Sequence, residues 1–312
     1  METVALGRGD VAVTRLALGC APLAGLYAPV EEAEARATVD AAWDAGVRAF
    51  DTAPLYGFGV SEQRVGAALR ERPRDELVLC TKVGRLLGPQ TGPPGPEAAQ
   101  FPAAPPLAPR FDFSRDGVLR SFEASLERLG VERIDVVHVH DPDEHMEAAL
   151  EQAYPALEEL RAQGLVRAIG AGMNQAPALA RLVREADLDC VLLAGRYTLL
   201  DRSAAAGLLP ACAERGVAVI AGGVFNSGIL AGGATYDYAP APAAVVARVG
   251  RMRAACDRHG ASLTAAALQF PLRHPAVACV LVGARSPAEL QEAARLLAEP
   301  VPAALWDELE QL

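Results

Sequence analysis

Four polar side chains of this 312-residue chain have the types and the placement expected of an acid–base catalytic group: Asp51, Tyr56, Lys82 and His140. Largely apolar runs precede Asp51 and Lys82, so both side chains are expected to be partly buried. A buried lysine needs a counter-charge, and Asp51 is the nearest candidate. Taken singly, each residue also has a structural interpretation, as a turn cap, a surface lysine, a rim aromatic or a strand-end histidine.

Lys82 would enable Tyr56 to transfer a proton by changing the pKa of its phenol. An unperturbed tyrosine titrates near ~10. A neighbouring cation favours the phenolate and moves the pKa of the phenol towards working pH, where it can exchange a proton with a substrate. The sequence therefore predicts a proton-transfer site built from these residues.

The elements that position these residues repeat along the chain. A helical pattern ends at a glycine, as at Gly46, Gly164 and Gly216, and a short apolar run follows at once. Glycine suits the left-handed residue just past a helix end, and such runs are typical of parallel strands buried on both faces. We expect eight strands: Arg15–Gly19, Val47–Asp51, Leu77–Lys82, Ile134–His140, Ala168–Gly172, Cys190–Leu193, Val217–Ala221 and Val277–Val282.

Eight strands alternating with helices predict an α/β fold, a (β/α)8 TIM barrel that forms one domain over residues 1–312. In the helix expected at Ser114–Leu129, apolar residues form one stripe, and Ser114 is placed to cap its start. The opening segment Val4–Val13 predicts a β-hairpin ahead of the first strand.

Two long segments interrupt this repeat: Gly84–Pro109 after strand three and Asn226–Pro242 after strand seven. Both follow the carboxyl ends of strands, where loops build the active site of such a barrel. We interpret both as ordered lids over a ligand. For the first, which is rich in proline and glycine, a disordered insertion is the alternative.

Composition narrows the partners and the compartment. The net charge of -10 argues against nucleic acid and against an anionic membrane surface. The N-terminus has no signal-peptide pattern, and the apolar runs are too short to span a bilayer. The six cysteines lack CxxC spacing, which disfavours a disulfide framework or a zinc knuckle and favours the cytoplasm.

Three motifs carry a resemblance to a known family: FDTAPLYG (Phe50–Gly57), CTKVG (Cys80–Gly84) and VHVHDP (Val137–Pro142). They resemble the aldo-keto reductase superfamily, and the resemblance continues in order through GAGMN, NSGIL and VGARSPAEL over essentially the whole chain. It implies that Tyr56 donates or accepts the proton, that Lys82 paired with Asp51 lowers its pKa, and that His140 orients the reacting oxygen. Tyr56 and His140, together with Tyr27, are then expected to contact the substrate.

The resemblance also implies a nicotinamide cofactor, held without a Rossmann domain. Asn174 matches the residue that holds the carboxamide, and the helix beginning near Pro287 offers its positive end to a phosphate. Backbone groups in two loops match the phosphate-binding positions, although ordinary turn geometry explains any single glycine among them; the residues concerned are Phe225, Gly228, Leu230 and Gly283.

Two residues bear on the choice between NAD and NADP. Glu289 stands where NADP-preferring relatives often carry a basic residue, so its carboxylate would repel a 2′-phosphate and accept from the ribose hydroxyls. Arg285 has the opposite tendency, since a guanidinium binds phosphate. We expect NAD to be preferred.

Ala194 and Gly222 replace a glutamine and an aromatic residue of many relatives, so the nicotinamide must be packed differently.

The segments HDPD, GMNQ, AGRYTLLD and GGVFNSGIL are similar to the aldose 1-dehydrogenase branch, which includes L-fucose, L-galactose and D-threo-aldose dehydrogenases. That similarity implies a small sugar, such as L-fucose, L-galactose or D-arabinose, oxidised at C1 from the hemiacetal to the lactone. Pyridoxal 4-dehydrogenases lie close to this branch. A general aldehyde or ketone reductase is a further alternative.

Three readings from other classes are weaker. A metal-dependent hydrolase is one alternative, suggested by the H-x-H pair His138 and His140 with Asp141, Asp143 and His145 nearby. Such a site usually needs further ligands on other strands, and these are lacking, so no metal is expected. A Rossmann loop at GAGMNQA is unsupported, because Gln175 stands where the third glycine belongs. A non-catalytic binding module would not need all four polar residues.

Overall fold

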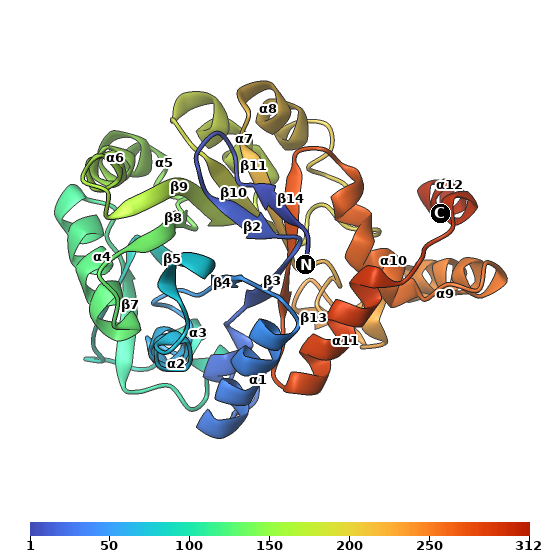
Figure 1. The fold of residues 1–312 in the computed structure, drawn as a ribbon, viewed down its shortest axis with the longest axis horizontal. Coiled ribbons are helices and arrows are strands. Elements are labelled where there is room, and N and C mark those ends of the chain that lie inside the picture. The colour runs from blue at the N-terminus through green and yellow to red at the C-terminus, as the bar shows by residue number, and fades with distance from the viewer.

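The computed structural model describes residues 1–312 and contains a closed barrel of parallel strands in the order β10-β11-β14-β3-β4-β5-β8-β9. Helices surround the barrel in the manner of a ring (Figure 1). The barrel strands are β3 (Leu16–Gly19), β4 (Ala49–Asp51), β5 (Val78–Val83), β8 (Ile134–His140), β9 (Val166–Met173), β10 (Cys190–Ala194), β11 (Ala218–Gly222) and β14 (Val277–Gly283).

The helices that connect these strands lie mainly on the outside of the barrel (Figure 1). They are α1 (Glu32–Asp44), α2 (Val60–Leu69), α3 (Pro96–Gln100), α4 (Arg115–Leu129), α5 (Met146–Ala148), α6 (Tyr154–Ala162), α7 (Ala176–Glu185), α8 (Leu208–Arg215), α9 (Ala243–Arg258), α10 (Leu263–Gln269), α11 (Pro287–Ala298) and α12 (Ala303–Gln311).

The (β/α)8 barrel predicted from the sequence is confirmed, and each expected strand is present with ends shifted by no more than two residues. The Rossmann alternative is wrong, because its glycine segment ends β9 inside the closed barrel. The six cysteines are all free and buried. No helix combines the length and the apolar character needed to cross a bilayer.

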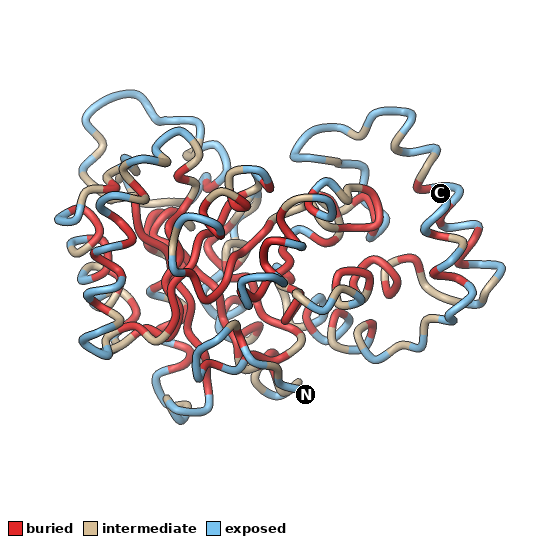
Figure 2. The backbone as a smooth tube through the Cα atoms, turned by 90° about the horizontal axis from the view of Figure 1, so that it is seen from above, coloured by how far each residue is buried: buried red, intermediate tan, exposed pale blue.

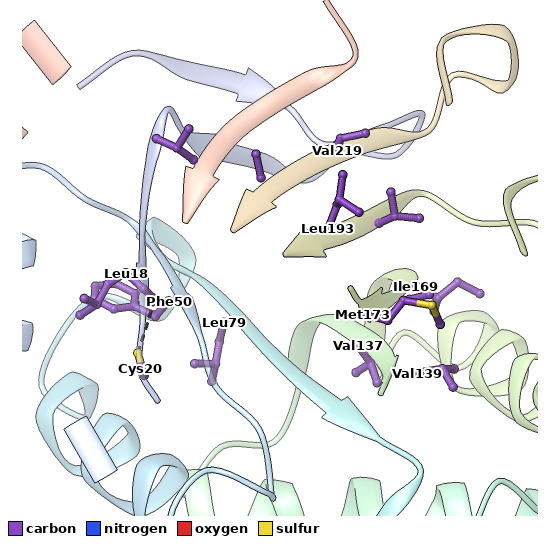
Figure 3. Close-up of a cluster of buried hydrophobic side chains, with 14 of the residues drawn as sticks. Leu18, Cys20, Phe50, Leu79, Val137, Val139, Ile169, Met173, Leu193 and Val219 are labelled. Atoms are coloured by element: carbon purple, nitrogen blue, oxygen red, sulfur yellow. Dashed lines mark hydrogen bonds between the residues drawn. The ribbon is translucent and has the colours of Figure 1, made fainter. Parts of the chain in front are cut away.

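Alternation along the strands divides the side chains into two layers. Residues such as Phe50, Val137 and Ile169 point outward and pack with the surrounding helices in the largest apolar cluster (Figure 3). Their neighbours of opposite parity point into the barrel, where Cys80, Val136 and other small apolar residues pack together. Because successive side chains of a strand face opposite sides, Asp51, Lys82 and His140 fall on the inward face at the carboxyl ends of their strands. The buried strands stand out against the exposed loops in Figure 2.

The expected N-terminal hairpin is present as β1 (Thr3–Ala5) paired antiparallel with β2 (Ala12–Thr14). Its apolar residues Leu6, Val11 and Val13 belong to the same cluster as the barrel interior. The hairpin therefore closes the end of the barrel opposite to the carboxyl ends of the strands.

Both long segments after strands are ordered, so the disordered alternative for Gly84–Pro109 is wrong. The first contains α3 and an antiparallel pair, β6 (Arg85–Pro89) with β7 (Leu107–Phe111). The second contains the short 3₁₀ turn η4 (Ile229–Ala231) and the two-stranded hairpin β12 (Thr235–Tyr236) and β13 (Ala239–Pro240).

The helix expected at Ser114–Leu129 is α4, and the hydroxyl of Ser114 accepts a hydrogen bond from the amide of Gly117 as its cap. Helix α4 packs tightly against α2. A Cβ atom placed on Gly66 of α2 would lie 2.1 Å from the carbonyl oxygen of Leu129. Glycine at this position is therefore required by the close approach of the two helices.

Two glycine-to-alanine changes within helices should have opposite effects. We expect Gly66→Ala to destabilise the protein by about 1–3 kcal/mol, because the new methyl group meets backbone. Gly250→Ala in α9 should stabilise it by about 0.5–1 kcal/mol, since no atom lies within 4 Å of the added Cβ and alanine is the better helix former. Urea unfolding of both variants measures the two differences, and equal shifts in the two would refute the packing explanation.

Candidate active site

The barrel places a buried ion pair at the carboxyl ends of two neighbouring strands. Lys82 Nζ lies 2.6 Å from Asp51 Oδ2, and their side chains are 2% and 4% exposed. The ammonium also donates to the carbonyl oxygen of Thr52 at 2.8 Å. Asp51 ends β4 and Lys82 lies one residue before the end of β5, so the pairing expected from the sequence is present. Breaking such a buried pair by removing one partner costs about 3–5 kcal/mol.

Tyr56 and His140 lie next to one another and close to this pair. The Lys82 ammonium is 4.7 Å from the centre of the Tyr56 ring. The rings of Tyr56 and His140 meet edge to face, with centres 6.0 Å apart. Tyr56 sits on the turn between β4 and α2, whose Gly57 has a φ of 60° and packs against Ala24. The structure thus gathers all four expected residues at one place.

The electrostatics of Tyr56 differ from the expectation. Burial raises the pKa of Tyr56 to about 12, although the charge of Lys82 acts to lower it. The sequence predicted a pKa moved towards neutrality, because a cation can be inferred from a motif but the depth of burial cannot. For Lys82, burial acts to lower the pKa, but attraction to Asp51 and Tyr56 outweighs it and the pKa is raised. Lys82 is therefore a permanent cation.

His140 is a neutral imidazole at neutral pH. Burial, together with the charges of Lys82 and Arg85, lowers its pKa well below the usual value. Its Nδ1 is buried without a hydrogen-bond partner, and its Nε2 lies 3.6 Å from Asp141 Oδ2. A neutral imidazole can donate a hydrogen bond to a substrate oxygen through one nitrogen.

A cavity of about 430 Å³ opens onto these groups. Tyr56, Lys82 and His140 line it, as do Tyr27 and Asn174, which the sequence placed at the substrate and the nicotinamide. Tyr27 lies on the rim and is 59% exposed. The cavity therefore lies at the residues that the sequence predicted to be catalytic.

The segment that follows β11 contains further expected residues. Asn226, Ser227 and Gly228 have φ values of 46°, 59° and 101° in succession, and the amides of Gly228 and Leu230 both donate to the carbonyl oxygen of Phe225. The amide of Ser227 has no backbone partner. Left-handed backbone with free amides makes a concave site for an anion. Only part of this loop is therefore available to a phosphate, and the side chain of Leu230 is buried in the core.

The remaining expected residues lie at the end of β14 and the start of α11. A Cβ on Gly283 would lie 2.8 Å from Pro22, which is a packing reason for glycine there. Glu289 Oε2 accepts from the amide of Arg285 at 2.8 Å, and Oε1 lies 3.1 Å from its guanidinium. The sequence predicted that Glu289 repels a 2′-phosphate and that Arg285 attracts it, whereas the structure pairs the two side chains with one another.

The departures at Ala194 and Gly222 are next to one another. The two residues are partners in the register of β10 and β11. A Cβ on Gly222 would make only ordinary contacts, the shortest at 3.6 Å, so a larger side chain is absent without being sterically forbidden. Ala194 lines the cavity.

Other residues of the cavity were not expected from the sequence. Arg85 and Tyr238 come from the two long segments and lie on the cavity wall, and the hydroxyl of Tyr238 accepts from the side-chain amide of Asn174 at 3.3 Å. Asp141 was noted only for metal binding. The sequence carries no periodic pattern that would predict the position of such residues, because the conformation of the loops brings them to the cavity.

Two other features carry no comparable chemistry. A cavity of about 740 Å³ lies beside the amino ends of β5 and β8. Three of its arginines are engaged in ion pairs: Arg72 with Asp40, Arg74 with Asp135 and Arg133 with Asp75. No cluster of three or more His, Cys, Asp or Glu side chains is arranged to hold a metal ion. His138 points into the barrel, with Nε2 3.5 Å from Cys190 Sγ.

Comparison with known proteins agrees with this geometry. The aldo/keto reductase family model matches residues 15–312. D-threo-aldose 1-dehydrogenase of a Pseudomonas species is 44% identical, over 98% of this chain and 96% of that protein. Pyridoxal 4-dehydrogenase of Microbacterium luteolum is 42% identical, over 99% and 96%.

A solved structure adds a match in three dimensions. The holo form of an aldo-keto reductase from Bacillus halodurans superimposes with a TM-score of 0.80 at 26% identity, covering 100% of this chain and 96% of that one. Aldo-keto reductases are oxidoreductases that use NAD(P)H. The family match over nearly the whole length, on a barrel with this site at the carboxyl ends of its strands, shows that the chain belongs to the aldo/keto reductase family.

Proposed function

We propose that this protein oxidises the C1 hydroxyl of a cyclic aldose to the lactone, with Tyr56 as the proton acceptor and a nicotinamide nucleotide as the hydride acceptor. The observation that carries the proposal is the meeting of the Asp51–Lys82 pair, Tyr56 and His140 at one cavity. The 44% identity to D-threo-aldose 1-dehydrogenase supports the substrate class.

The residues present fit such a cofactor. The free amide of Ser227 in a left-handed turn suits a phosphate group. Asn174, on the cavity wall, offers an amide to a carboxamide. The bound nucleotide would supply the hydride acceptor. The protein supplies the position of the sugar and the transfer of the proton.

Each group near the reacting carbon then has one task. Tyr56 takes the proton of the anomeric hydroxyl. Lys82, held as a cation by Asp51, stabilises the phenolate that takes this proton. His140 donates a hydrogen bond to the substrate oxygen and stays neutral, because burial and the charge of Lys82 both lower its pKa.

Pyridoxal is the second candidate substrate, favoured by the 42% identity to pyridoxal 4-dehydrogenase. It also reacts as a cyclic hemiacetal, so the same tasks would fall on the same residues. For either substrate, we propose the cytoplasm as the compartment and the whole chain as one catalytic domain.

The substrate class is tested with the purified protein and both cofactors. L-fucose, L-galactose, D-arabinose and pyridoxal are compared by the absorbance of the reduced nicotinamide, and we expect turnover of at least one aldose. Tyr56→Phe should reduce kcat by about 10²–10⁴-fold, with cofactor binding retained in a fluorescence titration. Activity with pyridoxal alone would show that pyridoxal, and not an aldose, is the substrate. An active Tyr56→Phe variant would refute the mechanism.

The pH dependence of oxidation should follow the phenolate of Tyr56. Since its pKa is raised to about 12, the phenolate fraction grows about tenfold per pH unit below that value, and kcat/KM for oxidation should rise up to alkaline pH. Lys82→Met should raise the pKa further and move the rise to higher pH, because the phenolate loses its cation. Thermal unfolding confirms that the variant is folded. A plateau at neutral pH in the wild type, or an unmoved profile in Lys82→Met, contradicts this role.

The cofactor preference should depend on Glu289. We propose that NAD is preferred, since the Glu289 carboxylate both opposes a 2′-phosphate and occupies the guanidinium of Arg285. Glu289→Gln frees Arg285 and should narrow the preference, chiefly through KM for NADP. Glu292→Gln, on the same helix and paired with Arg295, is the matched control. A wild-type enzyme that prefers NADP and loses this preference in Arg285→Ala would assign the site to Arg285 instead.

A further inference from the structure

A second ion pair stands on the wall of the cavity next to the reacting groups. Arg85 Nη2 lies 2.8 Å from Asp141 Oδ2, and both residues line the cavity with Tyr56 and His140. Arg85 begins β6, three residues after Lys82, and Asp141 directly follows His140. Because β5 and β8 are adjacent strands, the pair joins the carboxyl ends of the two strands that carry Lys82 and His140.

Backbone geometry fixes both residues in place. Asp141 has a φ of 46°, a left-handed conformation that aspartate tolerates better than most residues, and its amide donates to the carbonyl oxygen of Gly172 at 3.0 Å. Gly84, just before Arg85, has a φ of 99°, and a Cβ there would lie 2.2 Å from the Phe113 ring. The chain is therefore turned back at two specific positions to bring this pair to the cavity.

The pair is left with unused hydrogen-bonding capacity. The Arg85 side chain is only 11% exposed, and its Nε is buried without a partner. On Asp141, Oδ2 faces Arg85, and Oδ1 takes part in no hydrogen bond. Buried polar groups are normally satisfied, so the unpartnered Nε of Arg85 is unusual. Asp141 Oδ1 belongs to a side chain that is 31% exposed and lines the cavity, so it is free to accept from a ligand there. A hydroxyl group, which both donates and accepts, matches a carboxylate next to a guanidinium.

The local charge indicates which ligands fit. Glu97 Oε1 lies 3.6 Å from Arg85 Nη1, so one cation is surrounded by two carboxylates and the group carries a net charge of about -1. The ring of Phe111 covers the guanidinium at 4.3 Å. An anionic substrate is disfavoured beside this group, whereas neutral hydroxyls are not.

The distance to His140 locates the hydroxyl on the substrate. Asp141 Oδ2 lies 3.6 Å from His140 Nε2, so an oxygen held by His140 has its nearest substituents close to Asp141. Beyond the pair lies a smaller cavity of about 290 Å³, which Arg85, Asp141 and Asn174 also line. The rest of a polyhydroxylated chain or ring has room on that side.

We propose that Arg85 and Asp141 bind the hydroxyl on the carbon next to the reacting one, and so select neutral 2-hydroxylated substrates over their deoxy counterparts. This inference rests on the proposed reaction at Tyr56 and names the substrate class of that site. Neither residue exchanges a proton or an electron with the substrate. Both determine specificity.

The test compares matched substrates in two variants. Asp141→Asn keeps a residue that tolerates the left-handed backbone, and Arg85→Gln keeps a polar side chain but removes the guanidinium charge. Each is assayed in reduction with lactaldehyde (2-hydroxypropanal) and propanal, which differ by the 2-hydroxyl alone, and in oxidation with an aldose and its 2-deoxy form. We expect kcat/KM for the hydroxylated member to fall about 10- to 100-fold, mainly through KM, because a hydrogen bond to a charged group is lost. The deoxy member should change by less than about 3-fold.

Controls separate this role from general damage. Arg110→Gln removes an exposed cation from the same hairpin, and Asp116→Asn removes an exposed carboxylate at the start of α4; neither should alter the ratio between the paired substrates. Arg85→Lys should recover part of the ratio. An equal loss with both members, no loss with either, or a wild-type enzyme indifferent to the hydroxyl would overturn the inference.

The outcomes also separate this inference from the proposed function. Absence of aldose oxidation, together with the expected change in the lactaldehyde-to-propanal ratio, would refute the aldose reaction and leave the hydroxyl-binding pair supported. Normal aldose oxidation with an unchanged ratio removes the pair and leaves the reaction standing.

Discussion

A lysine enclosed in the end of a barrel has no water to stabilise its charge, and this constraint shapes the site. Lys82 stays charged because Asp51 lies 2.6 Å away and Thr52 offers a carbonyl oxygen. An unpaired buried ammonium would cost several kcal/mol. The partners are the last residue of the adjacent strand β4 and the residue that follows it, so the register of β4 and β5 determines whether the charge is stabilised.

The same enclosure acts on the neighbouring groups in different directions. Burial disfavours any charged form, so it raises the pKa of Tyr56 and lowers that of His140. Lys82 opposes burial at Tyr56 and reinforces it at His140. The Lys82 cation thus helps to keep His140 neutral, as a hydrogen-bond donor. It also makes the Tyr56 phenolate less unfavourable than it would be with burial alone. Two groups that titrate in opposite senses are what a proton-transfer site requires.

The strands were predictable because a strand buried on both faces requires a short continuous apolar run, which is visible in the local sequence. Ile134–His140 was placed to the residue, and the inward position of Asp51 and Lys82 follows from strand parity. The hairpin of β6 with β7 was not predicted, because pairing Arg85 with Phe111 depends on contacts across a long segment. The Arg85–Asp141 pair and the elevated pKa of Tyr56 were missed for the same reason, since each depends on how residues distant in sequence enclose a common space.

A spectroscopic titration of the Tyr56 phenol decides whether Lys82 governs the proton acceptor. Tyrosines labelled with ¹³C at the ring carbon that bears the hydroxyl are followed by NMR in the wild type and in Lys82→Met, and Tyr56→Phe assigns the signal. The structure predicts that Tyr56 titrates near 12 in the wild type and at still higher pH without the lysine. A Tyr56 that titrates at the ordinary tyrosine value in both proteins would contradict the coupling between the ion pair and the phenol.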